Sequence, residues 1–491
     1  MKISINQLEQ YLSKAAWILK GPVDASDFKS YIFPLLFFKR ISDVYDEEFN
    51  LALEESNKDK EYAALKEFHR FLIPKDCHWK DVREKTQNVG LKIESSLRGM
   101  EQSNQGSLSG IFGDVQWSNK ERLSDSLLIN LVEHFSIYNL SNSNVETDIL
   151  GQSYEYLIKH FADLTNKKAG EFYTPRSVIN LLTLILEPKE NDSIYDPACG
   201  TGGMLIECIN YLKLKNRKFK TLKIYGQEKN LNTNSIARIN MFLHDVEDFN
   251  IKVGDTLTNP AFYEKDNLKK FDCVVANPPF SLKNWGAENW FNDPYGRNFA
   301  DTPPKGNGDM AWLQHMIKSL NSNGRMGVIL PHGILFRKGA EERIRKKILE
   351  LDLIECVIGL GPNIFYGTTL APCILILKKR KEKTKKGKII FIDASNLIKV
   401  TRSQNYLEQE HIDQIFDWYK KFEDVKNHVT ITSESQLKKN NYNLNISLYI
   451  KKVIKDDLPS FKEAIFDLKK NWNDYLVIKE NFEKKLNRFI K

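Results

Sequence analysis

The sequence of 491 residues predicts an α/β fold, in which a parallel sheet carries helices on both faces. From about residue 150 to residue 400, short apolar runs alternate with stretches of helical periodicity, which is typical of parallel sheets. Before this region the periodicity is helical only, and after Pro459 apolar residues recur every three or four positions. We therefore expect a helical domain at 1–150, an α/β domain at 151–435 and a helical tail at 436–491.

The N-terminal region is predicted to be helical because its apolar residues follow helical spacing. Pro34 lies within one of these stretches, where a kink is expected because proline removes a backbone donor. The two stripes consist of Leu8, Leu12, Ala15 and Leu19, and of Phe28, Ile32, Leu35 and Phe38.

A glycine-rich turn is the first candidate site of the α/β region. A short apolar strand, Ser193–Tyr195, leads into it, and an apolar helix, Met204–Leu212, follows. Glycines let a backbone approach a ligand closely, and the start of a helix offers free N–H groups to an anion. The turn lacks the GxGxxG spacing of dinucleotide folds, and an ordinary tight turn is the alternative. Cys199 is expected to serve packing. The candidate binding residues are Asp196, Gly200, Thr201, Gly202 and Gly203.

Acidic residues end the next two predicted strands. Glu228 ends the strand at 222–228 and follows the glycines at close to the spacing expected of a ribose-binding acid. Asp255 ends the strand at 251–255 and is suited to accept a hydrogen bond from an adenine amino group. For both acids, a role as turn residue or helix cap is the alternative.

Asn277-Pro278-Pro279-Phe280 follows Cys273–Ala276, an apolar run that is predicted to be a buried strand. Open α/β sheets place their chemistry where strands end. The Asn277 side-chain oxygen and the Pro278 carbonyl are two neighbouring acceptors, suited to hold one amino group. The prolines stiffen the loop, and the Phe280 ring offers a face for stacking. A plain Asn-Pro turn is the alternative.

The segment Gly170–Val178 precedes all of these motifs. Thr174 is predicted to be a helix N-cap with Pro175 at the first helical position, because apolar residues then recur at helical spacing. A well-capped helix without further function is the alternative. The apolar positions are Val178, Leu181, Leu182 and Ile185.

In this order, the four segments resemble the motifs of the gamma class of DNA adenine methyltransferases. The FYTP sequence ends at Pro175, the DPxCGxGG loop runs from Asp196 to Gly203, and the tetrapeptide at Asn277 comes last. The resemblance narrows to the modification subunits of Type I restriction–modification systems, over nearly the whole chain. The further matching segments are 21–40, 328–336, 364–369 and 441–447.

The resemblance implies a Rossmann-like methyltransferase domain that uses S-adenosylmethionine and no metal. It also implies direct methyl transfer to an adenine that is flipped from the duplex and stacked on Phe280. The implied catalytic residues are Asn277, Pro278, Pro279 and Phe280. The implied cofactor-binding residues are Glu171, Phe172, Tyr173, Thr174, Pro175, Arg176, Asp196, Gly200, Thr201, Gly202, Gly203, Glu228 and Asp255.

The implied partners are double-stranded DNA, a specificity subunit that reads the sequence, a second modification subunit and restriction translocase subunits. The tail has an aromatic seam with a mean spacing of about 3.5 residues, which is typical of a coiled coil and needs a partner. Docking on the specificity subunit is expected, and packing on the chain's own N-terminal helices is the alternative. The seam consists of Phe461, Ile465, Leu468, Trp472, Tyr475, Ile478, Phe482, Leu486 and Phe489.

Length and composition agree with a large cytosolic enzyme, and the resemblance implies the cytoplasm of a bacterium or archaeon. The six cysteines are scattered, so neither a disulfide framework nor a zinc site is indicated. The longest apolar run, near Tyr31–Phe38, is too short to span a bilayer. The net charge of +8 indicates a modest preference for an anionic partner.

Three further segments carry weaker predictions. Asn284–Asn307 is expected to be a long loop that contacts DNA or an extruded base, followed by a helix that Asp309 caps. Lys378–Lys388 holds eight basic residues and is predicted to be a solvated hairpin tip, with a phosphate contact as the alternative. His332 is expected to be structural.

Two other functions compete with DNA adenine methylation. The first is a methyltransferase that acts on protein glutamine or on RNA guanine. Such an enzyme can use a similar Asn-Pro-Pro-aromatic site, because any planar exocyclic amine fits it. A catalytically silent assembly subunit is the second alternative, and intact motifs in all four places argue against it.

Overall fold

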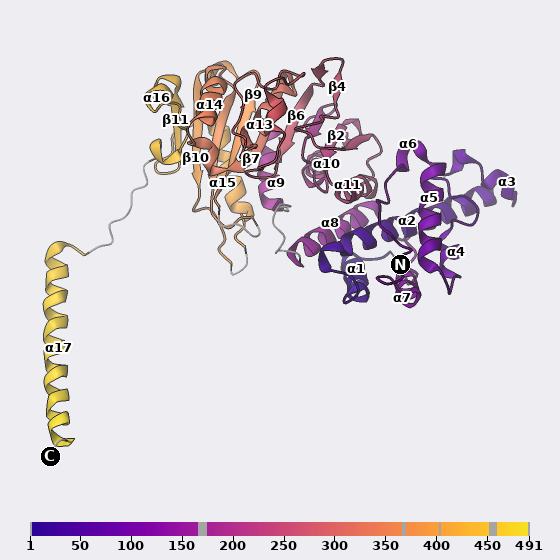
Figure 1. Cartoon of the computed structure of the whole chain (residues 1–491), viewed down its shortest axis with the longest axis horizontal. Coiled ribbons are helices and arrows are strands. Elements are labelled where there is room, and N and C mark those ends of the chain that lie inside the picture. Colours follow the sequence, from indigo (N-terminus) through magenta and orange to yellow (C-terminus); the bar gives the residue numbers. More distant parts are fainter. Residues whose placement is uncertain (1, 165–173, 366–369, 402–403, 451–458, 490–491) are drawn as a thin grey trace. The chain divides into compact units, whose positions relative to one another are not determined.

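A computed structural model of the chain describes residues 2–164, 174–365, 370–401, 404–450 and 459–489 (Figure 1). The chain divides into two compact units, of which the first ends at Ile450 and the second begins at Lys451.

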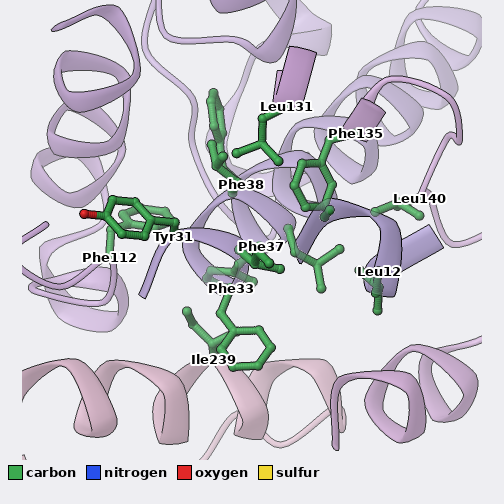
Figure 2. Close-up of a cluster of buried hydrophobic side chains, with 14 of the residues drawn as sticks. Leu12, Tyr31, Phe33, Phe37, Phe38, Phe112, Leu131, Phe135, Leu140 and Ile239 are labelled. Atoms are coloured by element: carbon green, nitrogen blue, oxygen red, sulfur yellow. The ribbon is translucent and has the colours of Figure 1, made fainter. Parts of the chain in front are cut away.

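The first unit begins with a helical domain built around α2, whose residues 31–45 are buried on all sides. Residues 31–38 are apolar on every side of the helix, which is typical of a core helix, and Phe33, Phe37 and Phe38 fill this core (Figure 2). The helix runs without interruption through Pro34. The helices are α1 (Ile5–Leu19), α2 (Phe28–Glu55), α3 (Lys60–Ala63), α4 (Trp79–Arg83), α5 (Val89–Ser103), α6 (Gln105–Leu108), α7 (Asp125–Phe135) and α8 (Thr147–Leu164), with 3₁₀ turns η1 (Ala25–Asp27) and η2 (Lys66–Phe68).

The expected boundary at residue 150 falls inside α8, which belongs to the helical core. Leu150, Tyr154 and Leu157 of α8 are fully buried there, and α8 packs on α1 and α2. Helix α8 therefore spans the expected boundary.

The α/β domain contains a nine-stranded sheet with the order β11-β10-β8-β9-β7-β6-β1-β2-β3. Strand β9 is antiparallel to β7 and β8, β11 is antiparallel to β10, and the other neighbours are parallel. The strands are β1 (Ser193–Asp196), β2 (Lys223–Glu228), β3 (Phe249–Val253), β6 (Phe271–Ala276), β7 (Leu320–Pro331), β8 (Ile354–Leu360), β9 (Pro372–Lys378), β10 (Lys388–Ala394) and β11 (Val429–Ser433), and β4 (Tyr263–Glu264) and β5 (Asn267–Leu268) form a separate hairpin.

Helices cover both faces of this sheet, as the sequence predicts (Figure 1). Alternate residues of β6 show the two faces, because Cys273 and Val275 belong to one core and Val274 and Ala276 to the other. The helices are α9 (Arg176–Leu186), α10 (Gly203–Leu214), α11 (Leu231–Leu243), α12 (Ala287–Trp290), α13 (Asp309–Lys318), α14 (Ala340–Glu350), α15 (Gln409–Lys421) and α16 (Glu434–Lys439), with 3₁₀ turns η3 (Phe219–Thr221), η4 (His332–Leu335), η5 (Lys383–Lys385) and η6 (Ile446–Leu448).

The position of β1 determines where a ligand can bind. Strand β1 lies between β6 and β2 and is parallel to both, so the chain leaves β1 at the point where the strand order reverses. Open α/β sheets bind ligands in the crevice at such a switch point, outside the carboxyl ends of the strands. The carboxyl ends of β1, β2, β3 and β6 meet at this edge.

The basic segment 378–388 connects β9 to β10, and the prediction of a hairpin tip is wrong. Strand β8 lies between β9 and β10, so the two strands are not hydrogen-bonded neighbours. Lys381 is buried and pairs with Asp352 at 2.6 Å. Lys378 forms an ion pair of 2.9 Å with the buried Glu355. Part of this charge is therefore neutralised within the fold.

The first unit extends further than the expected boundary at residue 435. Leu437, Leu444 and Ile446 are buried in the core beside the sheet, and Ile450 closes this part of the chain. The short α16 and η6 carry these residues, and such short elements leave little periodicity in a sequence.

The second unit contains one long helix, α17 (Phe461–Phe489), where the seam predicts a helix (Figure 1). Its described side chains are exposed, and the exposed fraction of the seam residues runs from 37% at Ile465 to 81% at Phe461. Within the described part of the chain, no helix combines the length and apolarity needed to cross a membrane.

Candidate active site

The glycine-rich turn joins β1 to α10, and two of its glycines have positive φ angles. Gly200 has φ +53° and Gly202 has φ +85°, in the region that side chains disfavour. A Cβ on Gly202 would lie 2.8 Å from the end of the flexible Met241 side chain, so the positive φ, more than packing, favours glycine there. A Cβ on Gly200 would meet no atom of the described residues within 4 Å. The backbone at Gly200 is therefore open to a ligand.

Hydrogen bonds from two neighbouring elements hold the turn in place. The Cys199 amide donates to the Gln227 carbonyl at 3.0 Å, and the Asn240 side chain of α11 donates to the Thr201 carbonyl at 3.0 Å. The Cys199 side chain packs against Gly226, where a Cβ would lie 3.0 Å from its sulfur. Burial raises the pKa of the Cys199 thiol well above its usual range. Cys199 serves packing, as the sequence predicts.

Asp196 ends β1 beneath the turn and is almost fully buried. Its carboxyl oxygen accepts from the Ala198 amide at 3.0 Å. Burial, with a further contribution from the charge of Glu228, raises the pKa of Asp196 to about 8. The carboxyl group is therefore protonated at neutral pH and stabilises the start of the turn.

Glu228 ends β2 and lies directly beside the turn. One of its oxygens accepts from the Gly200 amide at 3.0 Å, and the other accepts from the Asn230 amide at 2.8 Å. These contacts correspond to the turn role that the sequence leaves open for Glu228, and its ribose-binding role stays a prediction.

Asp255 follows β3 and has partners on both oxygens. One oxygen accepts from the Leu257 amide at 3.1 Å, and the other forms an ion pair of 2.8 Å with Lys229. These contacts correspond to the turn role that the sequence leaves open for an acid at a strand end.

Asn277 follows β6, one strand away from the glycine-rich turn. Its side-chain nitrogen donates to the Thr174 hydroxyl at 2.9 Å. Its side-chain oxygen is buried and has no hydrogen-bond partner among the residues that the structure describes. Pro278 is buried, and the half-buried Phe280 lies edge-on to Phe365, with ring centroids 5.9 Å apart.

The loop after Asn277 is anchored by a buried ion pair that the sequence did not reveal. Ser281 has φ +52°, and its amide donates to the Asp309 carboxylate at 2.7 Å. Asp309 is fully buried, and Arg337 donates to its other oxygen at 2.8 Å. The prediction that Asp309 caps a helix is wrong, because Gly308 is the N-cap of α13 and Asp309 bonds to Ser281 instead. The only sequence signal for this contact was the position of Asp309, an acid directly after a loop rich in Gly and Asn.

Thr174 also differs from its prediction as an N-cap. Helix α9 begins at Arg176 with Pro175 as its N-cap, and the helix has no side-chain cap. The Thr174 hydroxyl bonds to Asn277 instead, so a contact far along the chain replaces the local one. Glu171, Phe172 and Tyr173 lie outside the described residues.

Arg176 forms an ion pair with Glu155 of α8 beside the glycine-rich turn. Burial raises the pKa of Glu155 to about 7, although the charge of Arg176 opposes this. A small cavity of about 20 Å³ lies here. It is lined by Glu155, Ile158, Arg176, Ile179, Thr201, Gly203, Glu207 and Asn240.

The aperiodic segment 284–307 has a core of its own. Trp285 and Trp290 are buried together with Trp312 of α13, and their cluster borders Ala198 of the glycine-rich turn. Arg297 is buried and forms an ion pair of 2.6 Å with Asp293. The segment has no sequence periodicity, and its buried tryptophans hold it in a defined conformation.

His332 and the cysteines complete the residues for which the sequence makes predictions. His332 is half-buried at the start of η4 and packs against Phe336. In the described ranges, no three His, Cys, Asp or Glu side chains gather in a group that could hold a metal ion, and all six cysteines are free.

A mostly parallel sheet with a glycine-rich turn after β1 and polar groups after β2, β3 and β6 defines a Rossmann-like methyltransferase. Two family models match the chain: that described as N-6 DNA methylase covers residues 145–457, and that described as the HsdM N-terminal domain covers residues 8–135. The chain therefore belongs to the N-6 DNA methylases, in the family of Type I restriction enzyme methylase subunits.

Curated relatives agree with this family. The MjaVIII Type I restriction enzyme methylase subunit of Methanocaldococcus jannaschii is 33% identical, over 98% of this chain and 84% of the relative. The MpnII Type I restriction enzyme methylase subunit of Mycoplasma pneumoniae is 28% identical, over 91% of this chain and 89% of the relative.

Solved structures share the fold. The Type I restriction-modification system methyltransferase subunit from Streptococcus thermophilus matches with a TM-score of 0.79 and 30% identity, over 91% of this chain and all of that chain. A chain from a study of complex assembly in the type I R-M system matches with a TM-score of 0.65, over 98% of each chain, and at 21% identity the likeness is one of fold.

Proposed function

We propose that this chain transfers a methyl group from S-adenosylmethionine to N6 of an adenine in double-stranded DNA, as the catalytic subunit of a Type I restriction–modification complex. The observation that carries the proposal is the Asn277 side-chain oxygen, a buried acceptor that has no partner in the described residues. An unpaired buried acceptor costs about 1–3 kcal/mol. Such a cost is expected where the donor that completes the group belongs to a substrate.

The residues of the glycine-rich turn fit S-adenosylmethionine. The open backbone at Gly200 permits close approach, and the Glu228 carboxylate beside it is suited to accept hydrogen bonds from the ribose hydroxyls. The free N–H groups at the start of α10 suit the carboxylate of the cofactor's amino acid end. When bound, the cofactor supplies an electrophilic methyl group on a sulfonium. The proposed binding residues are Pro175, Arg176, Asp196, Gly200, Thr201, Gly202, Gly203, Glu228 and Asp255.

The loop at Asn277 fits the amino group of a flipped adenine. The Asn277 oxygen and the Pro278 carbonyl accept its two N–H donors, which directs the nitrogen lone pair toward the methyl group. The same acceptors stabilise the positive charge that develops on nitrogen during the attack. Phe280 is half-buried, so part of its ring remains accessible for stacking with the base.

Direct transfer assigns no covalent role to a side chain. With S-adenosylmethionine bound, its methyl group would pass directly to the amino nitrogen as the carbon–sulfur bond breaks, and the methylated amine would lose one proton to solvent. Cys199 takes no part in the attack, because burial keeps its thiol protonated.

The proposed partners are a specificity subunit, a second modification subunit and restriction translocase subunits. Helix α17 presents aromatic and aliphatic side chains along one seam, and an exposed apolar stripe of this kind is typical of an interaction site. We assign α17 to docking on helices of the specificity subunit, which brings the catalytic chain to its DNA sequence.

The test is product analysis with the chain purified together with its specificity subunit. Labelled S-adenosylmethionine is offered with DNA that carries the recognition sequence, and with RNA and protein in parallel. Label is expected in N6-methyldeoxyadenosine after digestion of the DNA. Label in guanine or glutamine would reassign the substrate, and absence of label in all three would indicate a catalytically silent subunit.

A further inference from the structure

The two ends of the Asn277 amide have nearly the same shape and opposite chemistry. The oxygen accepts hydrogen bonds and the nitrogen donates them. A half turn about the bond between Cβ and Cγ exchanges them, so an asparagine that must present its oxygen to a substrate needs a contact that fixes this rotation. In this protein the only polar contact made by the amide, among the described residues, is the 2.9 Å hydrogen bond from its nitrogen to the Thr174 hydroxyl.

The hydroxyl of Thr174 can accept or donate, so the unpaired end of the amide decides which orientation is stable. With the nitrogen on Thr174, one of its two N–H groups is paired, and the oxygen and the other N–H have no partner among the described residues. With the amide reversed, both N–H groups would lack a partner there. Orphaned buried N–H groups are rarer in proteins than under-satisfied carbonyl oxygens. The contact with Thr174 therefore favours the orientation in which the oxygen faces the site.

We propose that Thr174 is a positioning residue that turns the Asn277 oxygen toward the target base, and that it thereby makes the site select a purine with an amino group at C6 over one with an oxygen there. The inference rests on the proposed function, since it concerns the same base and the same acceptor. Hypoxanthine has the shape of adenine but carries an oxygen at C6, which places two acceptors against each other. Thr174 was expected from its motif to contact the cofactor, and its hydroxyl bonds to the Asn277 amide.

Thr174→Val tests this role, because valine keeps the shape of threonine and removes the hydroxyl. In the complex with the specificity subunit, kcat should fall at least about tenfold, since a misaligned group loses its contribution to the transition state. The dissociation constant of S-adenosylmethionine should stay within about twofold. Thr174→Ser keeps the hydroxyl and should restore kcat to within about threefold of wild type. Thr183→Val, in the helix α9 that follows Thr174, is the matched control and should retain wild-type kcat.

Discrimination between adenine and hypoxanthine provides a second measurement that a general loss of stability would not change. Binding of DNA with either base at the target position is measured in the presence of S-adenosylhomocysteine, and the ratio of the two dissociation constants is taken for each variant. The intrinsic cost of flipping each base cancels when ratios are compared between variants. The ratio should narrow roughly two- to tenfold in Thr174→Val, which corresponds to one net hydrogen bond, and should return in Thr174→Ser.

Several outcomes would overturn the inference. An unchanged ratio with unchanged kcat would show that Thr174 does not orient the amide. A weakened affinity for S-adenosylmethionine with normal kcat would assign Thr174 to the cofactor. Failure of the proposed function is distinct, because the wild-type complex would then transfer no methyl group to adenine in DNA.

Discussion

Replacement of Asn277 by alanine should abolish most of the methyl transfer while leaving cofactor binding close to normal. The substitution removes the acceptor that is proposed to hold the adenine amino group and stabilise its developing charge. Loss of one preorganised group of this kind costs about 10²–10³ in kcat, or about 2.7–4 kcal/mol of transition-state stabilisation. Neither Glu228 nor the glycine-rich turn contacts Asn277 through any hydrogen bond of the described residues, so the cofactor site should be preserved.

The cost of Asn277→Ala to folding should be small. The variant loses one hydrogen bond to Thr174, worth about 1 kcal/mol, and it also removes an oxygen that is buried without a partner. The assay combines transfer of labelled methyl to DNA, calorimetric titration with S-adenosylmethionine and thermal unfolding. Asn321→Ala is the control, because Asn321 bonds to Asp272 at the opposite edge of the sheet. A kcat within tenfold of wild type for Asn277→Ala would refute the assigned role.

Three further predictions concern the cofactor, the turn and the tail. Glu228→Ala should weaken S-adenosylmethionine binding by roughly 1–3 kcal/mol through lost charge-assisted hydrogen bonds, and unchanged affinity in calorimetry would leave Glu228 a turn residue only. Asp196 holds its proton more tightly when folded, at a pKa of about 8, than when unfolded, at about 3.8. Its contribution to stability is therefore present at low pH and lost as pH rises through this window. The urea midpoint of Asp196→Asn, measured relative to that of wild type, should therefore be higher at pH 9 than at pH 5. An equal difference between variant and wild type at both pH values would contradict this. Truncation after Leu458 should preserve cofactor affinity and abolish site-specific DNA methylation, and co-purification of the truncated chain with the specificity subunit at unchanged stoichiometry would refute docking through α17.

The motifs around the sheet edge could be predicted because each follows directly from a local pattern. The buried run Cys273–Ala276 ends at Asn277, and the short strand Ser193–Tyr195 ends at the glycine-rich turn. Parallel strands of an open sheet bring such endings to one edge, so a correct fold class was enough to group them. The structure places both segments at that edge, on neighbouring strands β6 and β1.

The contacts that orient these motifs could not be predicted in the same way. Thr174 bonds to Asn277 and Arg337 bonds to Asp309 across long stretches of chain. Pairs of side chains that are distant in sequence leave no periodicity, and local rules gave both Thr174 and Asp309 the wrong partner, as helix caps. The prediction of a hairpin tip at 378–388 failed for a related reason, because β8 lies between β9 and β10 in the sheet.

Helix α11 connects the helical domain to the candidate active site. One of its faces contributes Ile236, Ile239 and Phe242 to the core of the helical domain, where Ile239 lies below Phe33 (Figure 2). From another face, Asn240 donates to the Thr201 carbonyl of the glycine-rich turn. Packed cores resist small deformations, so a displacement of the helical domain that moves α11 would also move the turn. The helical domain therefore supports the geometry of the candidate active site in addition to its own fold, because part of α11 belongs to its core.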